Sequence, residues 1–468
     1  MNKKEHRTLS LAQAILPFVF LILSIFIIRI VLGGPIPLAV AIGAIFAAFV
    51  AVSANYTWDE LQSGICNTIH ACLPALLIMF AIGMVMGSWI VGGIVPAMIY
   101  YGLDLLSPSF FLVASCLISA VMSLATGSSW STCGTVGVAL LGVGAGLGMP
   151  AGMTAGAVIS GAWFGDKLSP MSDSTNLAPA MAGTDVFTHA RHMIKTTLPS
   201  FLIALVIYGI IGIRFANHNI DTSSIAMYQD AITGSFTISP LMLIPPILVI
   251  VLVILKLPAL PSLLIVALVG SIYAAVFQHM DFVSILNALY SGAKLDTGFA
   301  EVNRLLNRGG MSSMLSTICL IMMGLSFAGI VETCGAIHVI LSKAKKLVHS
   351  NFSLILVTML STFLTVAATG VNNVAMIING RVWREEYPAH GLHPKNLSRA
   401  LEDSGTLTGV FFPYSTDASY LMGIFGLTTG AYIPFCFFNI INPIVALICA
   451  KMGWFVAEMT DEEKAAYQ

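Results

Sequence analysis

The sequence has 468 residues, of which 9% are charged and 57% are hydrophobic, and its formal net charge is −1. Soluble domains carry roughly 25% charged residues, so this composition and a mean hydropathy of +0.90 exclude a soluble enzyme and indicate a surface that faces lipid. The near-neutral charge balance offers no basic field, and we expect no nucleic-acid partner.

Apolar stretches follow one another along the whole chain. The first, 11–32, comes after Lys3, Lys4 and Arg7 and is long enough to cross about 30 Å of hydrocarbon. Further apolar runs lie near 36–53, 71–95, 109–125, 133–164, 196–214, 240–256, 258–279, 311–341, 351–368, 405–425 and 431–457. The pattern predicts an all-α polytopic membrane protein in the bilayer, with about eleven to thirteen segments that cross the membrane or re-enter it.

Short fragments recur in the same order in the two halves of the chain. Residues 43–50 resemble 270–277 at an offset of 227, and residues 61–64 resemble 289–292 at an offset of 228. Residues 125–127 match 368–370 at an offset of 243, and Pro170 matches Pro413 at the same offset. Matches in sequence order favour a duplication, and repeats of this kind in transporters enclose a substrate site near the middle of the bilayer.

We expect residues 1–215 to form the first inverted repeat, 216–239 an extracytoplasmic connector, and 240–468 the second inverted repeat. The connector contains no Lys or Arg but has Asp221 and Asp230, whereas the N-terminus is basic. The positive-inside rule therefore places the N-terminus in the cytoplasm of a cell inner-membrane protein, on the side opposite the connector. The basic cluster 343–346 also fits the cytoplasm, but segment 293–308, with three basic residues, fits less well.

The most unusual polar interruption, residues 166–179, lies between two membrane-length apolar stretches. It contains Asp166, Asp173, several hydroxyls and two prolines, each of which removes an N–H that a continuous helix needs. Unwound backbone at membrane depth is tolerated only where it is buried in protein or lines a wet cavity. Freed carbonyls, hydroxyls and a carboxylate suit a small hard cation, and a buried carboxylate also attracts protons. The segment therefore predicts a site for which Na⁺ and H⁺ compete.

A plainer interpretation is a polar loop between two helices, with Ser169 or Asp173 as an N-cap and Asp166 paired to Lys167. The matched segment in the second half argues against it, because Pro413 is again followed by hydroxyls and an acid inside an apolar run. Two further interruptions, 126–132 and 369–373, are paired in the same way. They are either tips of re-entrant hairpins or packing faces of helices rich in small polar residues.

An acidic cluster, Glu402 and Asp403, opens the predicted helix that leads to Pro413. The helix dipole favours acids in a first turn, so a capping role and an ion-binding role both stay open. Lys395 and Arg399 upstream could neutralise these acids. His189, Arg191, His192 and Lys195 precede another apolar helix, and we expect them to form a cationic anchor at the membrane interface.

One string closely resembles the signature of the NhaC family of Na⁺/H⁺ antiporters: Trp163-Phe-Gly-Asp166-Lys-Leu-Ser-Pro170-Met-Ser-Asp173-Ser-Thr-Asn176-Leu-Ala-Pro179. That family includes sodium-linked exchangers of malate and lactate, and residues 402–406 resemble its second-half element. The resemblance implies the ion-transporter superfamily, with paired hairpins, broken helices and, by analogy, a homodimer with an elevator mechanism. One departure is Tyr414-Ser415-Thr416-Asp417-Ala418 where such proteins often carry Trp-Asn-Thr-Cys-Gly, which leaves room for an organic substrate or a changed ion stoichiometry.

Our leading hypothesis is a Na⁺/H⁺ antiporter in which Asp166 and Asp173 alternate between proton and sodium, with Ser174 and Thr175 as further sodium ligands. The predicted site also includes Thr126, Ser128, Ser129, Ser169, Ser172, Asn176, Asn372, Asn373, Glu402, Asp403, Ser415, Thr416 and Asp417. The alternative is an exchanger of small organic acids or amino acids driven by the same ions, with a substrate carboxylate on hairpin-tip N–H groups. A channel is a third class. Catalytic and nucleotide-binding motifs are lacking, so we expect neither an enzyme nor a cofactor.

Overall fold

The structure is a computed structural model that describes residues 6–219, 222–255 and 257–467. Among the residues used to predict the topology, Lys3, Lys4 and Asp221 lie outside these ranges. The described residues are predominantly helical, and their one β-type pairing is an isolated antiparallel bridge between Leu392 and Glu458. The prediction of an all-α chain is confirmed.

Long helices form the N-terminal part, and side-chain caps explain where two of them begin. The Ser10 hydroxyl accepts from the Gln13 N–H at 3.3 Å, and the Gln13 side chain accepts from the Ser10 N–H at 3.0 Å. Thr57 and Glu60 form the same capping box at the next long helix. The elements are α1 (Leu11–Ile25), its π-helical continuation η1 (Phe26–Val31), α2 (Ile36–Ser53), α3 (Trp58–Val91) and α4 (Ile94–Leu105).

The rest of the first half contains several short helices. These elements are α5 (Pro108–Thr126), α6 (Ser129–Thr132), the π-helix η2 (Cys133–Gly137), α7 (Val138–Gly146), α8 (Ala151–Leu168), α9 (Asp173–Ala182), α10 (Val186–Asn219) and α11 (Thr222–Ser235). Segment 216–239, predicted as a connector, therefore holds the end of α10 and the whole of α11.

The second half begins after α11 and is broken in a similar way. Its first elements are η3 (Pro240–Leu243), α12 (Ile244–Ile254), α13 (Ala259–Val276), α14 (Phe282–Ser291), α15 (Ala300–Leu306), η4 (Met311–Met314), α16 (Leu315–Thr333), α17 (Ala336–Ala344), η5 (Lys345–Leu347), α18 (Asn351–Thr369) and α19 (Asn372–Trp383). The last are α20 (Glu386–Ala389), α21 (Lys395–Leu401), the π-helix η6 (Glu402–Thr406), η7 (Gly409–Phe411), α22 (Thr416–Phe425), α23 (Thr429–Tyr432), η8 (Ile433–Phe435), α24 (Phe437–Met452) and α25 (Asp461–Tyr467).

Eight helices in the described ranges are long and apolar enough to cross a membrane, or up to ten if each of two bent helix pairs counts as one span. The shorter apolar helices α4 and α14 come in addition. The chain is thus a multi-pass membrane protein. The eleven to thirteen segments predicted included re-entrant ones, and apolar runs such as 133–164 and 405–425 are divided among shorter elements.

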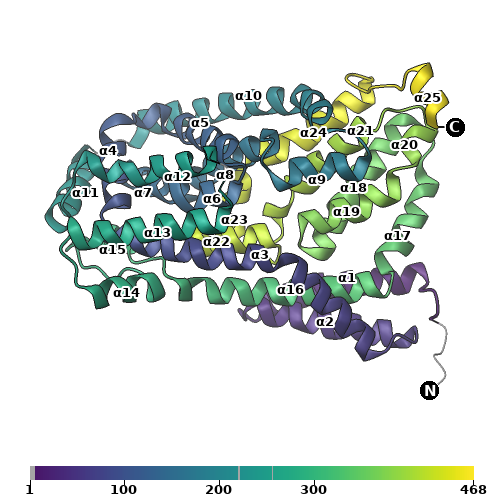
Figure 1. Cartoon of the computed structure of the whole chain (residues 1–468), viewed down its shortest axis with the longest axis horizontal. Helices are drawn as coiled ribbons and strands as arrows, with labels where there is room; N and C mark the ends of the chain where they lie inside the picture. Colours follow the sequence, from purple (N-terminus) through teal and green to yellow (C-terminus); the bar gives the residue numbers. More distant parts are fainter. Residues whose placement is uncertain (1–5, 220–221, 256, 468) are drawn as a thin grey trace.

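The helices run mostly along one axis of the molecule, and the two ends of this bundle hold different elements (Figure 1). Both chain termini lie at one end, together with α17, α20 and α25, whereas α4 and α11 lie at the other. The N-terminal part and segment 216–239 are therefore at opposite ends, as the charge argument requires. Which end faces the cytoplasm stays a prediction.

Helix boundaries in the second half repeat those of the first at one offset. α5 and α18 both have 19 residues, α9 and α22 both have 10, and in each pair the first residues are 243 apart (351 − 108 and 416 − 173). Gly127 and Gly370, separated by the same offset, end α5 and α18 with φ of 65° and 68°, which glycine adopts without strain. The predicted offset recurs in the structure at these elements, and the inverted relation of the two halves stays a prediction.

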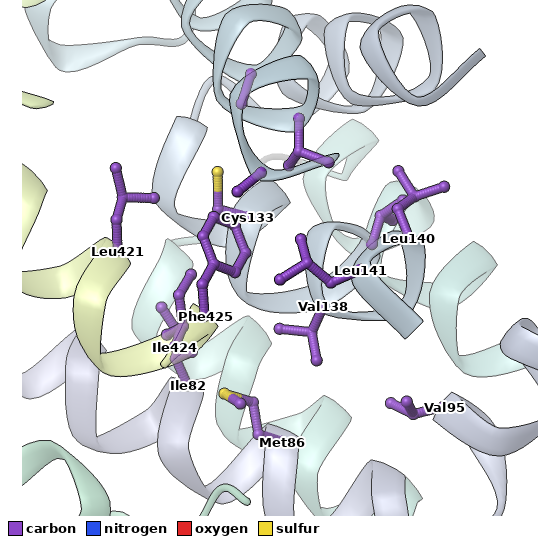
Figure 2. Close-up of a cluster of buried hydrophobic side chains, with 14 of the residues drawn as sticks. Ile82, Met86, Val95, Cys133, Val138, Leu140, Leu141, Leu421, Ile424 and Phe425 are labelled. Carbon is purple, nitrogen blue, oxygen red and sulfur yellow. The ribbon is translucent and has the colours of Figure 1, made fainter. Parts of the chain in front are cut away.

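The largest buried apolar cluster joins elements from both halves of the chain. Figure 2 shows side chains of α3, of η2 with α7, and of α22 gathered in one place: Ile82, Met86, Cys133, Val138, Leu141, Leu421, Ile424 and Phe425. η2 follows the first polar interruption, at 126–132, and α22 follows the break at Pro413. Packing of this cluster therefore holds polar segments of the two halves in a fixed relation to each other.

α5 and α8 approach each other closely because two glycines of α8 face the backbone of α5. A Cβ atom on Gly161 would lie 2.0 Å from the carbonyl oxygen of Cys116, and one on Gly165 would lie 2.3 Å from that of Ala120. Small residues let membrane helices pack backbone to backbone. Asp166 follows directly on Gly165 in the same helix, so this contact positions the first acid of the polar segment.

We expect Gly161→Ala to lower the melting temperature in mild detergent, because the added Cβ forces α5 and α8 apart and overpacking costs about 1–3 kcal/mol. Gly234→Ala is the matched control, since no heavy atom lies within 4 Å of the position that a Cβ would take at this residue of α11. This control should leave the melting temperature unchanged or slightly raised. Equal melting temperatures for wild type and Gly161→Ala would contradict the close approach.

Candidate functional site

In each half a helix break touches a turn between two consecutive helices. These turns, which we call the hairpin tips, lie at Gly127 between α5 and α6 and at Gly370 between α18 and α19. Pro170 lies in the break between α8 and α9, and Pro413 in the break between η7 and α22. A Cβ on Gly127 would lie 2.8 Å from a backbone atom of the first break, and one on Gly370 would lie 3.2 Å from a backbone atom of the second. The N–H of Thr416 also donates to the carbonyl of Gly370 at 2.9 Å. The paired polar interruptions therefore form two similar contact regions, one in each half, where a hairpin tip touches a helix break.

A cavity of about 690 Å³ is lined by residues of both contact regions. Eleven predicted site residues line it, namely Ser128, Ser129, Asp166, Ser172, Asp173, Ser174, Asn176, Asn372, Asn373, Thr416 and Asp417. The other lining residues are Ala71, Cys72, Ala75, Ile78, Gly127, Trp130, Trp163, Leu177, Val371, Val374, Ile377 and Thr406. The structure thus brings both hairpin tips, the motif of the first half and the acid of the second half to one place, and ion binding by these residues stays a prediction.

Asp166, in the last turn of α8, is half-buried and connects this helix to the first hairpin tip. The hydroxyl of Ser129 donates to its Oδ2 at 2.6 Å, a short distance typical of a hydrogen bond to a charged acceptor. Ser129 is buried at the start of α6, directly after the tip. A carboxylate has about four lone-pair sites and Asp166 lines the cavity, so it can accept further contacts from a molecule or ion there.

Asp417, in the first turn of α22, is buried and held from both halves of the chain. The indole of Trp130 donates to Oδ1 at 2.8 Å, and the amide of Asn372 donates to Oδ2 at 2.6 Å. Trp130 is stacked on Tyr420 with ring centroids 4.6 Å apart, and the Tyr420 hydroxyl donates to the Trp130 carbonyl at 2.7 Å. Asp417 is therefore the point where the first hairpin, the second hairpin and the second break are joined.

Asp173 differs from the other two acids because its side chain is exposed to the cavity and has no hydrogen-bond partner within the described ranges. It is the first residue of α9, after the N-cap residue Ser172. The interpretation with Ser169 or Asp173 as the N-cap is therefore wrong. An uncommitted carboxylate on the cavity wall is free to take a proton or a cation.

Six predicted residues lie outside the cavity lining, and four of them are hydroxyl residues whose side chains bond to local backbone. Ser169 accepts from the N–H of Met171 in the first break at 3.3 Å, and Ser415, the N-cap of α22, accepts from the N–H of Ala418 at 3.1 Å. Thr175, predicted as a sodium ligand, donates to the last carbonyls of α8 at 3.1 and 3.2 Å. Thr126 donates to the carbonyl of Ser128 at 3.4 Å. These side chains stabilise the irregular backbone around the cavity.

Asp403 forms an ion pair with Lys167, and both side chains are fully buried. The amide of Asn442 also donates to Asp403 Oδ1 at 2.7 Å, and the hydroxyl of Thr196 donates to Oδ2 at 3.4 Å. The pair connects α8 of the first half with η6 of the second. The two pairings considered from the sequence, Lys167 with Asp166 and the later acids with residues 395 or 399, do not occur, because Asp403 lies against Lys167.

Glu402 is fully buried beside this pair, and neither of its carboxylate oxygens has a hydrogen-bond partner in the described part of the chain. A role in capping is wrong, because α21 continues directly into the π-helix η6 and Glu402 is inside this continuous helix. π-Helical turns are frequent at functional sites. Glu402 is not part of the cavity lining, and its predicted role in ion binding stays a prediction.

Two histidines near the start of α10 are buried in the protein and face neither lipid nor water. His189 and His192 are 0% and 3% exposed, and the ring of His189 is hydrogen-bonded to the hydroxyl of Ser398 on α21. The prediction of an interfacial anchor is therefore wrong for these two histidines, whereas Arg191 and Lys195 are exposed and their part in it stays a prediction. The sequence pattern misleads because the two histidines precede the most apolar part of α10 while facing the second half of the protein.

Sequence reasoning left out three groups that shape the cavity. The indole of Trp163 donates to the carbonyl of Thr406 at 3.0 Å, and Asn372 donates to the same carbonyl at 3.3 Å. Trp130, which binds Asp417, is the second group. Both tryptophans lie inside the polar strings, where an indole N–H in an apolar setting needs an acceptor, and this was an available signal. The third group is the wall formed by α3, with Cys72, whose sequence is that of an ordinary apolar helix and gave no signal.

The lining carries three carboxylates, Asp166, Asp173 and Asp417, and contains no Lys, Arg or His among the described residues. Lys167, the nearest basic residue along the chain, is paired with Asp403 instead. The cavity therefore has a negative field that attracts cations. Within the described ranges no three His, Cys, Asp or Glu side chains are grouped in a way that could hold a metal ion, so additional ligands to a cation would be the neutral oxygens of the lining.

We expect Lys167→Met to destabilise the protein by about 3–5 kcal/mol, because Asp403 is left as an unpaired buried charge. The double variant Lys167→Met/Asp403→Asn carries neither charge and should regain most of the lost melting temperature in detergent. Lys451→Met, at an exposed position on α24, is the matched control and should behave as wild type. A double variant as unstable as Lys167→Met would show that the unpaired charge is not the cause.

Known proteins resemble this chain over nearly its full length. The sequence model of the Na⁺/H⁺ antiporter family matches residues 161–454. A malate-2H⁺/Na⁺-lactate antiporter of Bacillus subtilis is 37% identical over 94% of this chain and 93% of its own length. The arginine/ornithine antiporter ArcD of Halobacterium salinarum is 34% identical, with coverages of 97% and 94%. The Na⁺/H⁺ antiporter NhaC of Alkalihalophilus pseudofirmus is 32% identical over 97% of both chains.

Among solved structures, the Alcanivorax borkumensis YdaH transporter aligns with 94% of this chain and 99% of its own, at a TM-score of 0.42 and 14% identity. The matched segment of the family includes the string 163–179, both acids of η6 and the break at Pro413. The resemblance drawn from the sequence is thereby confirmed. The chain belongs to the Na⁺/H⁺ antiporter family.

Proposed function

We propose that this protein is a secondary active transporter that exchanges Na⁺ for H⁺ across the membrane. The observation that carries the proposal is the cavity lined by Asp166, Asp173 and Asp417 and, in the described part of the chain, by no basic side chain. Three carboxylates in a membrane-embedded cavity are costly unless protons or bound cations neutralise them. A transporter that exchanges bound Na⁺ for protons at these carboxylates, with the two ions taken up from opposite sides of the membrane, is an antiporter.

The neutral oxygens around these acids suit the coordination of Na⁺. Ser172 and Ser174, whose hydroxyls lie 3.2 Å apart, line the first break. The carbonyl oxygen of the Asn372 side chain is buried and has no partner in the described ranges, so it is an acceptor available to a cation or water. Because Asp417 binds Trp130 and Asn372 from different halves, cation binding here would act on both halves at once.

The size of the cavity favours a second candidate, a Na⁺- or H⁺-coupled exchanger of a small organic solute. About 690 Å³ is far more than one Na⁺ needs and falls in the range of small-molecule sites. The negative lining suits a cationic amino acid better than a dicarboxylate, unless bound Na⁺ or protons neutralise the acids first. Relatives named for arginine/ornithine exchange and for malate/lactate exchange represent both kinds of solute.

We also propose a setting in the cytoplasmic membrane, with the N-terminus in the cytoplasm, and a homodimer working by elevator-type alternating access without a cofactor. The basic cluster 343–346 supports this orientation because it lies on α17 and η5, at the same end of the bundle as the N-terminus (Figure 1). The homodimer and the elevator motion rest on analogy with related folds.

We expect Asp173→Asn and Asp166→Asn to slow Na⁺-dependent proton movement in proteoliposomes by about tenfold to a hundredfold, because loss of a charged ligand costs about 1.5–3 kcal/mol. The measurement is the change in lumenal pH after a Na⁺ gradient is applied. Asp59→Asn is the matched control, because Asp59 is exposed at the start of α3 and outside the cavity. Exchange at the wild-type rate in both cavity variants would contradict the proposal.

The same vesicles distinguish the two candidate functions when arginine, malate or lactate is added on one side or omitted. Exchange in the absence of any organic solute supports Na⁺/H⁺ antiport. Proton movement that requires a solute supports the second candidate, and the solute that restores it identifies the substrate class. Current recordings under opposed gradients exclude a channel if no uncoupled current flows.

A further inference from the structure

An apolar groove of about 380 Å³ lies away from the polar cavity, between α1, α17 and α18. α17 packs against both α1 and α18 and closes the base of the groove. The lining includes Phe18, Ile22, Ile340, Leu347, Leu360 and Leu364. Apart from Ser361, Thr365 and Tyr414, all the lining side chains are hydrocarbon.

The few polar atoms of the groove already have partners. Ser361 donates to the carbonyl of Thr358 at 3.0 Å, and Thr365 donates to the carbonyl of Ser361 at 2.7 Å. The Tyr414 hydroxyl donates to the carbonyl of Ala367. A polar ligand would find no free hydrogen-bonding group among these side chains, so the part of an occupant that lies inside the groove must be apolar.

The groove opens on a face of the protein that meets lipid. Ile22, Leu360 and Leu364 line it and are 63%, 52% and 50% exposed, and α1 and α18 are both helices long and apolar enough to span the membrane. At this depth the molecules that cover an exposed apolar surface are lipid acyl chains. An acyl chain from the surrounding bilayer is therefore the expected occupant of the groove.

Three lysines are neighbours, in the chain, of residues that line the groove. Ala344 and Leu347 line the groove, and Lys343, Lys345 and Lys346 flank them on α17 and η5. Lys345 is paired with Glu386 at 2.8 Å, whereas Lys343 and Lys346 are exposed. Basic residues beside an apolar groove between membrane helices match an anionic lipid headgroup.

We propose that this groove binds one anionic phospholipid, with an acyl chain between α1 and α18 and the phosphate at Lys343 and Lys346. The site is separate from the polar cavity, so it does not depend on which solute the protein carries. Its inner wall includes Tyr414, which lies in the break before α22. A bound lipid would therefore contact the segment that leads to Asp417.

The test uses the full-length protein in a neutral detergent and phosphatidylglycerol that carries a photoactivatable group within one acyl chain. We expect labelled peptides from α1, α17 and α18, with labelling competed by unlabelled phosphatidylglycerol and not by phosphatidylcholine. Lys343→Gln/Lys346→Gln should raise the concentration for half-maximal labelling by about tenfold or more. Lys451→Gln, which removes an exposed charge elsewhere, should leave it unchanged.

A second pair of variants tests the groove itself. Leu364→Trp fills the groove and should abolish labelling of these three helices, whereas Leu268→Trp, at a position 63% exposed on α13 and outside the groove, should not. If Leu364→Trp does not give a monodisperse protein, Leu360→Trp takes its place. Equal competition by phosphatidylcholine, labelling spread evenly over all exposed helices, or cross-links between two copies of the chain at the groove would each overturn the proposal.

Discussion

The fold depends on one constraint, which is that lipid cannot satisfy the hydrogen bonds of an interrupted helix. The chain is interrupted at Pro170 and again at Pro413, and residues beside both interruptions line one cavity. The carbonyl of Gly370 accepts from the N–H of Thr416 beside the second break, and Gly127 packs against the backbone of Met171 in the first break. A polar site in the middle of an apolar protein follows from this arrangement, because the unwound segments need both protein and water to be stable.

Charge is distributed by the same constraint. The buried charges of Lys167 and Asp403 neutralise each other in an ion pair that joins the two halves of the chain. Asp166 and Asp417 accept hydrogen bonds from neutral donors, namely Ser129, Trp130 and Asn372. Neutralisation of their charge therefore requires a proton or a cation that enters the cavity from water. This division separates a fixed charge pair that supports the fold from carboxylates that can exchange a proton for a cation.

The sequence was sufficient to predict the helical class, the repeat offset of 243 and most of the Ser, Thr, Asn and Asp residues in the cavity lining, because prolines and acids inside apolar runs are rare and costly. It could not predict which acid meets which base. Lys167 lies next to Asp166 in sequence, but the turn of α8 directs it to Asp403, 236 residues away. The burial of His189 depends on contacts between the halves, and no local pattern contains that information. The positions of Trp130 and Trp163 inside polar strings indicate that each indole needs an acceptor, but the acceptors lie in the second half of the chain.

The central claim is that cavity carboxylates give up protons when Na⁺ binds. Calorimetric titration of the purified protein with NaCl, in two buffers of the same pH but different ionisation enthalpy, tests it most directly, with choline chloride as the control for ionic strength. The account predicts a Na⁺-specific heat that differs between the buffers, because released protons are taken up by the buffer. A Na⁺-specific heat that is the same in both buffers would contradict it.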